Sequence, residues 1–305
     1  MDNPETCPDN YIDESAAESI ASTRATMEYI NSLDPSQSYV SPIITPRFAA
    51  SCSSDALSQL GDLAASTSPP TRIQTHISEN VDEINLVLSQ FPECKSYAEV
   101  YDKTNLLTPR TILAHAVHLS PEERSLISDR GSGISHCPAS NSAMTSGLCP
   151  VLKLLDDGIA VGLGTDVSGG YSPSILEAAR QACLVSRMVA CEEHGGKGAH
   201  SGRETLGVEE ALYLATRGGA KVVGMEDDIG GFEKGMLWDA QMIGLGGVIN
   251  DDEEGYKETS GDGDGAVDVF GWESWEEKVA KWMWAGDDRN VKAVWVGGKL
   301  VHSRG

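Results

Sequence analysis

The sequence predicts an α/β fold, namely a (β/α) barrel arrangement followed by a small β-rich appendage. Helix-like and strand-like segments alternate along the first 220 residues, which is typical of parallel strands joined by crossover helices. Polar side chains gather where the strand-like segments end, and a (β/α) barrel builds its active site at that edge. We therefore expect a barrel portion over residues 1–220 and a C-terminal segment over residues 221–305 that contains the appendage.

The expected elements follow one another in a regular order. Residues 15–33 carry apolar side chains at helical spacing, and the extended run 40–45 comes next. The later helix and strand pairs are 55–65 with 72–76, 81–90 with 111–115, 121–130 with 133–136, and 147–157 with 159–165, before a long helix over 172–193. Five such strands do not close an eight-stranded barrel by themselves.

The character of the chain changes after residue 195. A polar, glycine-rich loop over 195–202 precedes a helix over 208–219, which ends at a Gly-Gly pair that suits a C-cap. Residues 236–243 and 291–301 alternate as strands do, the second run with a Gly-Gly hairpin turn. Residues 250–265 are acidic and glycine-rich, which predicts a solvated, mobile insertion without a catalytic role.

The composition limits the class of partner. A formal net charge of -23 repels phosphate backbones and anionic lipid surfaces, so we expect neither nucleic acid nor membrane as a partner. A small neutral or cationic substrate fits better. The seven cysteines form no Cys-x-x-Cys pair, and no secretory signal or membrane-spanning run is present. These features predict a cytoplasmic protein.

Four polar residues at strand ends form a partial metal-hydrolase pattern. His76, His115 and Asp166 offer the imidazole and carboxylate atoms that zinc or iron takes when it activates water. Glu79, three residues after the first histidine, suits a proton shuttle from the water to the leaving group. Ligand type alone does not distinguish zinc from iron.

Other patterns allow more than one interpretation. The string from His136 to Ser142 either lines the pocket or forms a tight turn that caps a following helix. The glycine-rich run 162–170 lacks the lysine of a phosphate-binding loop, which favours a tight turn around Asp166. Arg47 is either a substrate contact or a surface ion-pair residue. A cytidine-deaminase type of site is excluded, because the required His-x-Glu and Pro-Cys-x-x-Cys motifs are missing.

Four ordered strings resemble those of the guanine deaminase family within the amidohydrolase superfamily. The resemblance runs from about residue 10 to residue 301. The strings are Thr45-Pro46-Arg47-Phe48, Thr75-His76-Ile77-Ser78-Glu79-Asn80, His136-Cys137-Pro138-Ala139-Ser140-Asn141-Ser142, and Gly162-Leu163-Gly164-Thr165-Asp166-Val167-Ser168-Gly169-Gly170.

The resemblance implies a (β/α)8 barrel with a small β-sandwich, one zinc ion per subunit, a homodimer, and the hydrolysis of guanine to xanthine and ammonia. It implies that His76 and Asp166 are metal ligands and substrate contacts, and that Glu79 is a proton shuttle that also contacts substrate. His115 corresponds to the histidine that orients the water, with Asp166 sharing the role of base. Arg47 and Phe48 match the pair that holds the purine by its carbonyl and its ring face.

One departure from the family pattern is large. The sequence has no His-x-His pair, which the superfamily carries on its first barrel strand, and His115 and His118 have a different spacing. Met1 aligns with a position inside the family's barrel. We therefore expect that an N-terminal portion is missing, with about three strands and two metal ligands, and that these 305 residues are inactive alone.

Two rival functions remain open. One is a related amidohydrolase that acts on another aminopurine, a pterin or a triazine. The other is a non-catalytic truncated fragment, whose unpaired strand edges would favour aggregation or pairing with another chain.

Overall fold

A parallel five-stranded sheet forms the centre of the molecule. The structure is a computed structural model and describes residues 1–195, 205–250, 257–259 and 266–304. The sheet order is β1-β2-β3-β4-β5, so strands that follow one another in the chain are neighbours. The strands are β1 (Ile43–Ile44), β2 (Arg72–Ile77), β3 (Thr111–His115), β4 (Gly133–His136) and β5 (Val161–Leu163). All four pairings are parallel, as the alternation of helices and strands predicts.

Each strand contributes a buried aliphatic side chain to one core. These side chains are at most 1% exposed, and helices pack over them. They are Ile44, Ile73, Ile77, Leu113, Ile134 and Val161. The buried aliphatic side chains hold the five strands in one sheet. Because the strands are parallel, their carboxyl ends all lie at the same edge of that sheet, and the residues that follow the strands meet there.

Local sequence explains where the helices begin. The first eight α-helices are α1 (Ala16–Leu33), α2 (Ser54–Ala65), α3 (Val81–Gln90), α4 (Tyr97–Lys103), α5 (Pro121–Arg130), α6 (Pro138–Ala143), α7 (Val151–Asp156) and α8 (Ile175–Glu193). Six of them start after a serine or asparagine whose side chain accepts a backbone N–H of the first turn. These caps are Ser15, Ser53, Asn80, Ser96, Ser120 and Ser174.

Several boundaries differ from the expectation. The extended run 40–45 contributes only Ile43–Ile44, and the strand expected over 159–165 is only Val161–Leu163. The helix expected over 147–157 begins at Val151, because Pro150 precedes it and Gly147 has φ +136°. Helices α4 and α6 are short, with seven and six residues, and the sequence patterns did not predict them.

The helix expected over 208–219 continues past its Gly-Gly pair. It runs as α9 (Val208–Tyr213), a π-helical turn over Leu214–Gly218, and α10 (Gly219–Val222). Gly218 and Gly219 are helical, with φ near -60°. An added Cβ on Gly218 would lie 2.5 Å from the carbonyl oxygen of Val161 in β5. The Gly pair therefore provides close packing against the sheet, and the prediction of a C-cap there was wrong.

The C-terminal segment forms a small antiparallel sheet. Its order is β10-β9-β6, with β6 (Ala240–Ile243), β9 (Val291–Val296) and β10 (Lys299–Ser303). Gly297 and Gly298 form the predicted turn, and both have positive φ. Helix α11 (Trp275–Ala285) was not predicted. The domain boundary near residue 220 stays a prediction.

The acidic run 250–265 is described only in part. Strands β7 (Val248–Asn250) and β8 (Lys257–Thr259) form a separate antiparallel pair. The predicted mobility of the remaining residues lies outside the described part of the chain, as does most of the loop expected over 195–202.

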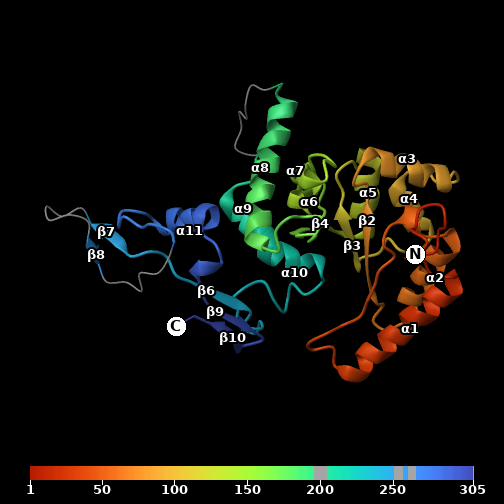
Figure 1. Cartoon of the computed structure of the whole chain (residues 1–305), viewed down its shortest axis with the longest axis horizontal. Coiled ribbons are helices and arrows are strands. Elements are labelled where there is room, and N and C mark those ends of the chain that lie inside the picture. The colour runs from red at the N-terminus through yellow and green to blue at the C-terminus, as the bar shows by residue number, and fades with distance from the viewer. Residues whose placement is uncertain (196–204, 251–256, 260–265, 305) are drawn as a thin grey trace.

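The parallel five-stranded sheet and the antiparallel sheet of β6, β9 and β10 lie on opposite sides of helices α8, α9 and α10 (Figure 1). Helices α1 and α2 pack against each other beside the first strands. Within the described residues, no helix combines the length and the apolar character that a membrane crossing requires.

Candidate functional site

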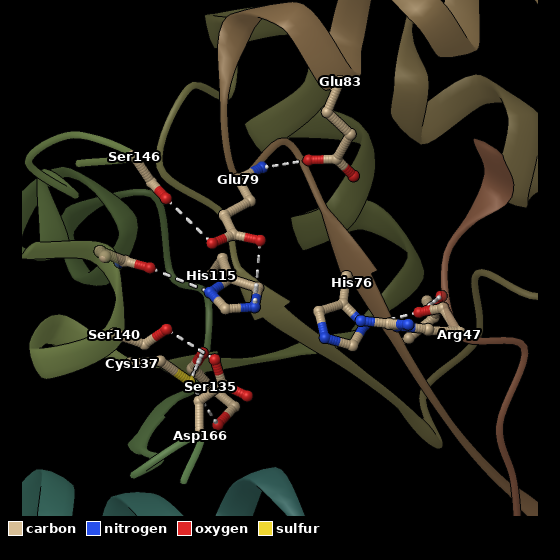
Figure 2. Close-up of polar contacts among 12 residues, drawn as sticks. Arg47, His76, Glu79, Glu83, His115, Ser135, Cys137, Ser140, Ser146 and Asp166 are labelled. Carbon is tan, nitrogen blue, oxygen red and sulfur yellow. Dashed lines mark hydrogen bonds and ion pairs between the residues drawn. The ribbon is translucent and has the colours of Figure 1, made fainter. Parts of the chain in front are cut away.

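The predicted site residues lie at the carboxyl edge of the parallel sheet. Arg47 and Phe48 follow β1, and His115 is the last residue of β3. His76 lies within β2 and Glu79 follows that strand by two residues, while Asp166 follows β5. The close-up shows side chains from these separate strands pointing toward one another (Figure 2). The expected gathering of polar groups at this edge is confirmed.

His76, His115 and Asp166 form a cluster that could hold a metal ion. Each offers one ligand atom, and these atoms lie within 4.8 Å of one another. The two imidazole rings are stacked, with centroids 5.0 Å apart. The family resemblance implied His76 and Asp166 as the ligands, and the geometry places His115 beside them as a third possible donor.

The surroundings of His76 suit a metal ligand. Its Nδ1–H donates to the Arg47 carbonyl at 2.5 Å, which leaves the lone pair on Nε2. Burial lowers the pKa of the imidazole, against a smaller opposing effect of that hydrogen bond. His76 is therefore held neutral, as a metal ligand must be.

His115 is oriented in the same way by a different partner. Its Nδ1 lies 2.9 Å from Oδ1 of Asn141, so Nδ1 carries the proton and Nε2 carries the lone pair. That Nε2 is buried and has no hydrogen-bond partner among the described residues. An unpaired acceptor of this kind fits either a metal ion or the water that the sequence interpretation assigned to it.

Asp166 is held by a neighbouring hydroxyl and a crowded turn. Ser140 Oγ donates to Oδ2 at 2.6 Å. Asp166 itself has φ +44°, a left-handed conformation that costs a non-glycine residue on the order of 1–3 kcal/mol. An added Cβ on Gly169 would lie 2.7 Å from the same carboxylate oxygen. The glycine-rich run is therefore a tight turn around Asp166, as its sequence favoured.

Glu79 is held at both its carboxylate and its backbone. Ser146 Oγ donates to Oε1 at 2.9 Å, while Oε2 lies 3.7 Å from Nε2 of His115. The Glu79 N–H donates to Glu83 Oε2 at 2.9 Å (Figure 2). The carboxylate therefore faces the histidine cluster without belonging to it, which suits a proton carrier.

A buried hydroxyl network supports the β2 end from behind. Tyr97 donates to Glu83 Oε1 at 2.7 Å. The Tyr101 hydroxyl donates to the His76 carbonyl at 2.7 Å and accepts the Ala49 N–H at 3.0 Å. Burial raises the pKa of both phenols, so they stay protonated and able to donate.

Arg47 and Phe48 lie beside His76 at the start of the site. The Phe48 ring meets the His76 ring edge-on, with centroids 6.3 Å apart, and the Arg47 guanidinium lies 5.7 Å from the Phe48 ring centroid. Arg47 is exposed and lines a polar cavity of about 510 Å³ with Thr45 and residues 10–13. The surface ion-pair interpretation gains no support, since no acidic partner of Arg47 is found among the described residues.

Ser140 and Asn141, within the string from His136 to Ser142, face the site, and the turn-and-cap interpretation of this string was wrong. Residues 138–143 are themselves helix α6, and its Ser140 and Asn141 bind Asp166 and His115. Burial raises the pKa of the Cys137 thiol, within the same string, to about 12, which favours the protonated thiol over the thiolate.

Sequence reasoning gave no role to several residues that position the site. Ser140 and Asn141 stood inside a recognised string but had no assigned partner. For Glu83 the sequence indicates only an acidic side chain in the first turn of a helix, three residues after the N-cap Asn80. Tyr101 begins a string that resembles the family but had no assigned role, and for Tyr97 and Ser146 the sequence carried no signal, because their partners are distant along the chain.

The family model described as "Amidohydrolase family" matches residues 3–301. The chain belongs to the amidohydrolase family. Its parallel sheet is thus part of an amidohydrolase barrel, and the small antiparallel sheet is the predicted appendage.

Individual amidohydrolases resemble this chain along nearly its whole length. It is 50% identical over 294 residues to "Probable guanine deaminase" of Schizosaccharomyces pombe, covering 96% of this chain and 52% of that protein. It is 38% identical to "Guanine deaminase" of Homo sapiens, covering 99% of this chain and 61% of that protein. The chain therefore spans a little over half the length of these relatives.

A solved amidohydrolase shares the fold. The structure is titled as guanine deaminase from C. acetobutylicum with guanine bound in the active site. It superposes with a TM-score of 0.78 at 33% identity, over 99% of this chain and 64% of that one.

Tyr101→Phe tests the network behind β2. The substitution removes the hydroxyl that pairs with the His76 carbonyl and the Ala49 N–H, so we expect the free energy of unfolding to fall by about 1–3 kcal/mol. Urea denaturation measures the change. The matched control is Tyr29→Phe, at a residue 64% exposed, where a change within about 0.5 kcal/mol is expected. Equal effects in the two variants would contradict the role of the network.

His136 predicts a dependence of stability on pH. Burial lowers the pKa of this fully buried imidazole from 6.5 to about 3. Between those values the unfolded chain binds a proton that the folded chain does not, so stability is lost as the pH falls below 6.5. The expected slope is about 1.4 kcal/mol per pH unit.

The comparison is between the unsubstituted chain and His136→Gln, by urea denaturation from pH 7 to pH 4 with a chelator present. The variant should lose less stability over this range. Parallel curves for the two proteins would show that His136 does not titrate as described.

Proposed function

We propose that the protein is a guanine deaminase, which hydrolyses guanine to xanthine and ammonia. The observation that carries the proposal is the convergence of His76, His115 and Asp166 within 4.8 Å, with the Glu79 carboxylate 3.7 Å from the cluster. The two relatives reported above and the guanine-bound neighbour carry this activity in their names.

We propose zinc as the cofactor, with His76 and Asp166 as its ligands and His115 within reach of it. The unpaired Nε2 of His115 and the carbonyl-anchored His76 fit an ion of this kind. Such an ion supplies activation of water at neutral pH. Iron uses the same donor types, so metal analysis of the purified protein distinguishes the two.

Glu79 moves the proton in this proposal. Its Oε2 accepts one proton from the attacking water and delivers it to the purine ring nitrogen. The second proton of that water, now on the added hydroxyl, passes to the amine through the same carboxylate, so that a carbonyl forms, the C–N bond breaks and the amine leaves as ammonia. Asp166 and His115 face the same space and orient the water, with Asp166 able to share the role of base.

Arg47 and Phe48 hold the substrate in this proposal. A guanidinium can donate two hydrogen bonds to the purine carbonyl and to an unprotonated ring nitrogen, and an aromatic face covers the flat base. Another aminopurine, a pterin or a triazine is the alternative substrate within the family. The response of substrate preference to Arg47 separates these cases.

The oligomeric state and the cellular compartment are proposed from the family resemblance. We propose a homodimer in the cytoplasm. The inactivity of the 305 residues alone stays a prediction, as does the rival interpretation as a non-catalytic fragment. Light scattering gives the oligomeric state of the same preparation that is assayed.

The activity test uses two proteins, because the chain covers 52% of its fission-yeast relative. One is the 305-residue chain with zinc, and the other is a chimera in which this chain replaces the matched segment of that relative. We expect little turnover by the chain alone and ammonia release from guanine by the chimera.

Within the chimera, Glu79→Gln should lower kcat at least ~100-fold without changing the zinc content. Glu28→Gln, at an exposed position on α1, is the matched control and should behave as the parent. A folded, zinc-loaded chimera without guanine turnover would overturn the proposed function.

Arg47→Ala tests the choice of substrate. Loss of the charge-assisted hydrogen bonds should lower kcat/KM for guanine by about 10- to 100-fold, with little change for 2-aminopurine, which lacks the carbonyl. Steady-state kinetics on both substrates measure the ratio. Arg24→Ala, at an exposed position on α1, is the control, and unchanged kinetics in Arg47→Ala would reject guanine as the preferred substrate.

A further inference from the structure

The loop between α6 and α7 brings a hydroxyl to the Glu79 carboxylate. Ser146 lies in this loop, 67 residues from Glu79 in the sequence, and its Oγ donates to Oε1 at 2.9 Å. Ser146 is only 8% exposed. The contact is drawn in Figure 2, where Ser146 and His115 approach the Glu79 carboxylate from different sides.

The backbone around Ser146 is held by two independent contacts. His118 Nε2–H donates to the Ser146 carbonyl at 2.7 Å. The Ser146 N–H donates to the Asn141 carbonyl at 2.8 Å, next to the side chain that orients His115. These bonds fix the direction from which the hydroxyl meets Glu79, and they give a function to His118, which is not part of the metal cluster.

Gly147 allows this arrangement because it has no side chain. Its φ is +136°, and an added Cβ would lie 2.9 Å from His118 Cε1. Thr145, on the other side of Ser146, also has positive φ. The loop is therefore shaped around the contact between His118 and Ser146.

The hydrogen bond makes the two oxygens of Glu79 different. Oε1 is occupied by the Ser146 hydroxyl, while Oε2 lies 3.7 Å from the unpaired Nε2 of His115. Rotation of the carboxylate away from this orientation would break the bond to Ser146. One oxygen is thus held as a hydrogen-bond acceptor and the other is left to face the reacting groups.

We propose that Ser146, held by His118, is a positioning residue that keeps Oε2 of Glu79 as the proton-carrying oxygen. The inference rests on the proposed function of Glu79 as proton shuttle. Holding the oxygen in place keeps Glu79 in the orientation that proton transfer requires. Loss of the Ser146 hydroxyl should therefore lower kcat and leave KM nearly unchanged.

The first experiment reads the position of Glu79 without catalysis. The 305-residue chain is labelled with 13Cδ-glutamate, and the Glu79 resonance is assigned by its loss in Glu79→Gln. The resonance should move in Ser146→Ala and in His118→Ala, and a double variant should move it no further than Ser146→Ala. It should stay in place in Ser146→Thr, which keeps the hydroxyl, and in Ser142→Ala, an exposed serine on neighbouring α6.

The second experiment measures the kinetic consequence in the zinc-loaded chimera. Ser146→Ala should lower kcat for guanine about 10- to 100-fold, the range of one hydrogen bond to a charged group, with KM changed less than about twofold. Ser146→Thr should restore most of kcat.

The outcomes separate the two proposals. An unmoved Glu79 resonance in Ser146→Ala, or an unchanged kcat in an active chimera, overturns the role of Ser146. An equal loss of kcat in Ser146→Ala and Ser146→Thr overturns it as well, because the hydroxyl would then not be the cause. Absence of turnover in the unsubstituted chimera overturns only the guanine deaminase assignment, and the resonance still decides whether Ser146 holds Glu79.

Discussion

The carboxyl end of β2 carries two site residues within four positions, and buried polar groups behind the strand fix its backbone. Tyr101 pairs with the His76 carbonyl and the Ala49 N–H, and Glu83 accepts the Glu79 N–H. A buried acceptor or donor without a partner costs about 1–3 kcal/mol, so the strand end cannot shift without that loss. The remaining site elements are arranged around this end.

The site is built from two histidines with fixed ring orientations and two carboxylates, each with one oxygen in a hydrogen bond. A backbone carbonyl and an amide oxygen fix the protonated nitrogens of His76 and His115, so both expose a lone pair to the same space. Hydroxyls from the α6 region bind one oxygen each of Asp166 and Glu79. The other oxygens are left for an ion, a water molecule or a proton, as the proposed hydrolysis requires.

Much of this was predictable from local sequence. Alternating helix and strand patterns predicted five parallel strands, and polar residues at their ends predicted His76, Glu79, His115 and Asp166 as one site. The failures also have local causes. Gly218 and Gly219 indicated a helix end but provide close packing, and helices α4 and α6 are too short to show a periodic pattern. The turn-and-cap interpretation of the His136 string failed because the string itself is helical.

The sequence by itself determined the fold class, the edge of the sheet that carries the site and the chemical types of its residues, because these depend on period, burial and strand direction. Only the tertiary structure decided which nitrogen of each histidine is free, and which oxygen of Glu79 is bound. Those choices depend on hydrogen bonds whose two partners are far apart in the sequence, by 26, 29 and 67 positions. No periodicity encodes such partners, since they meet only after the sheet has brought the strand ends together.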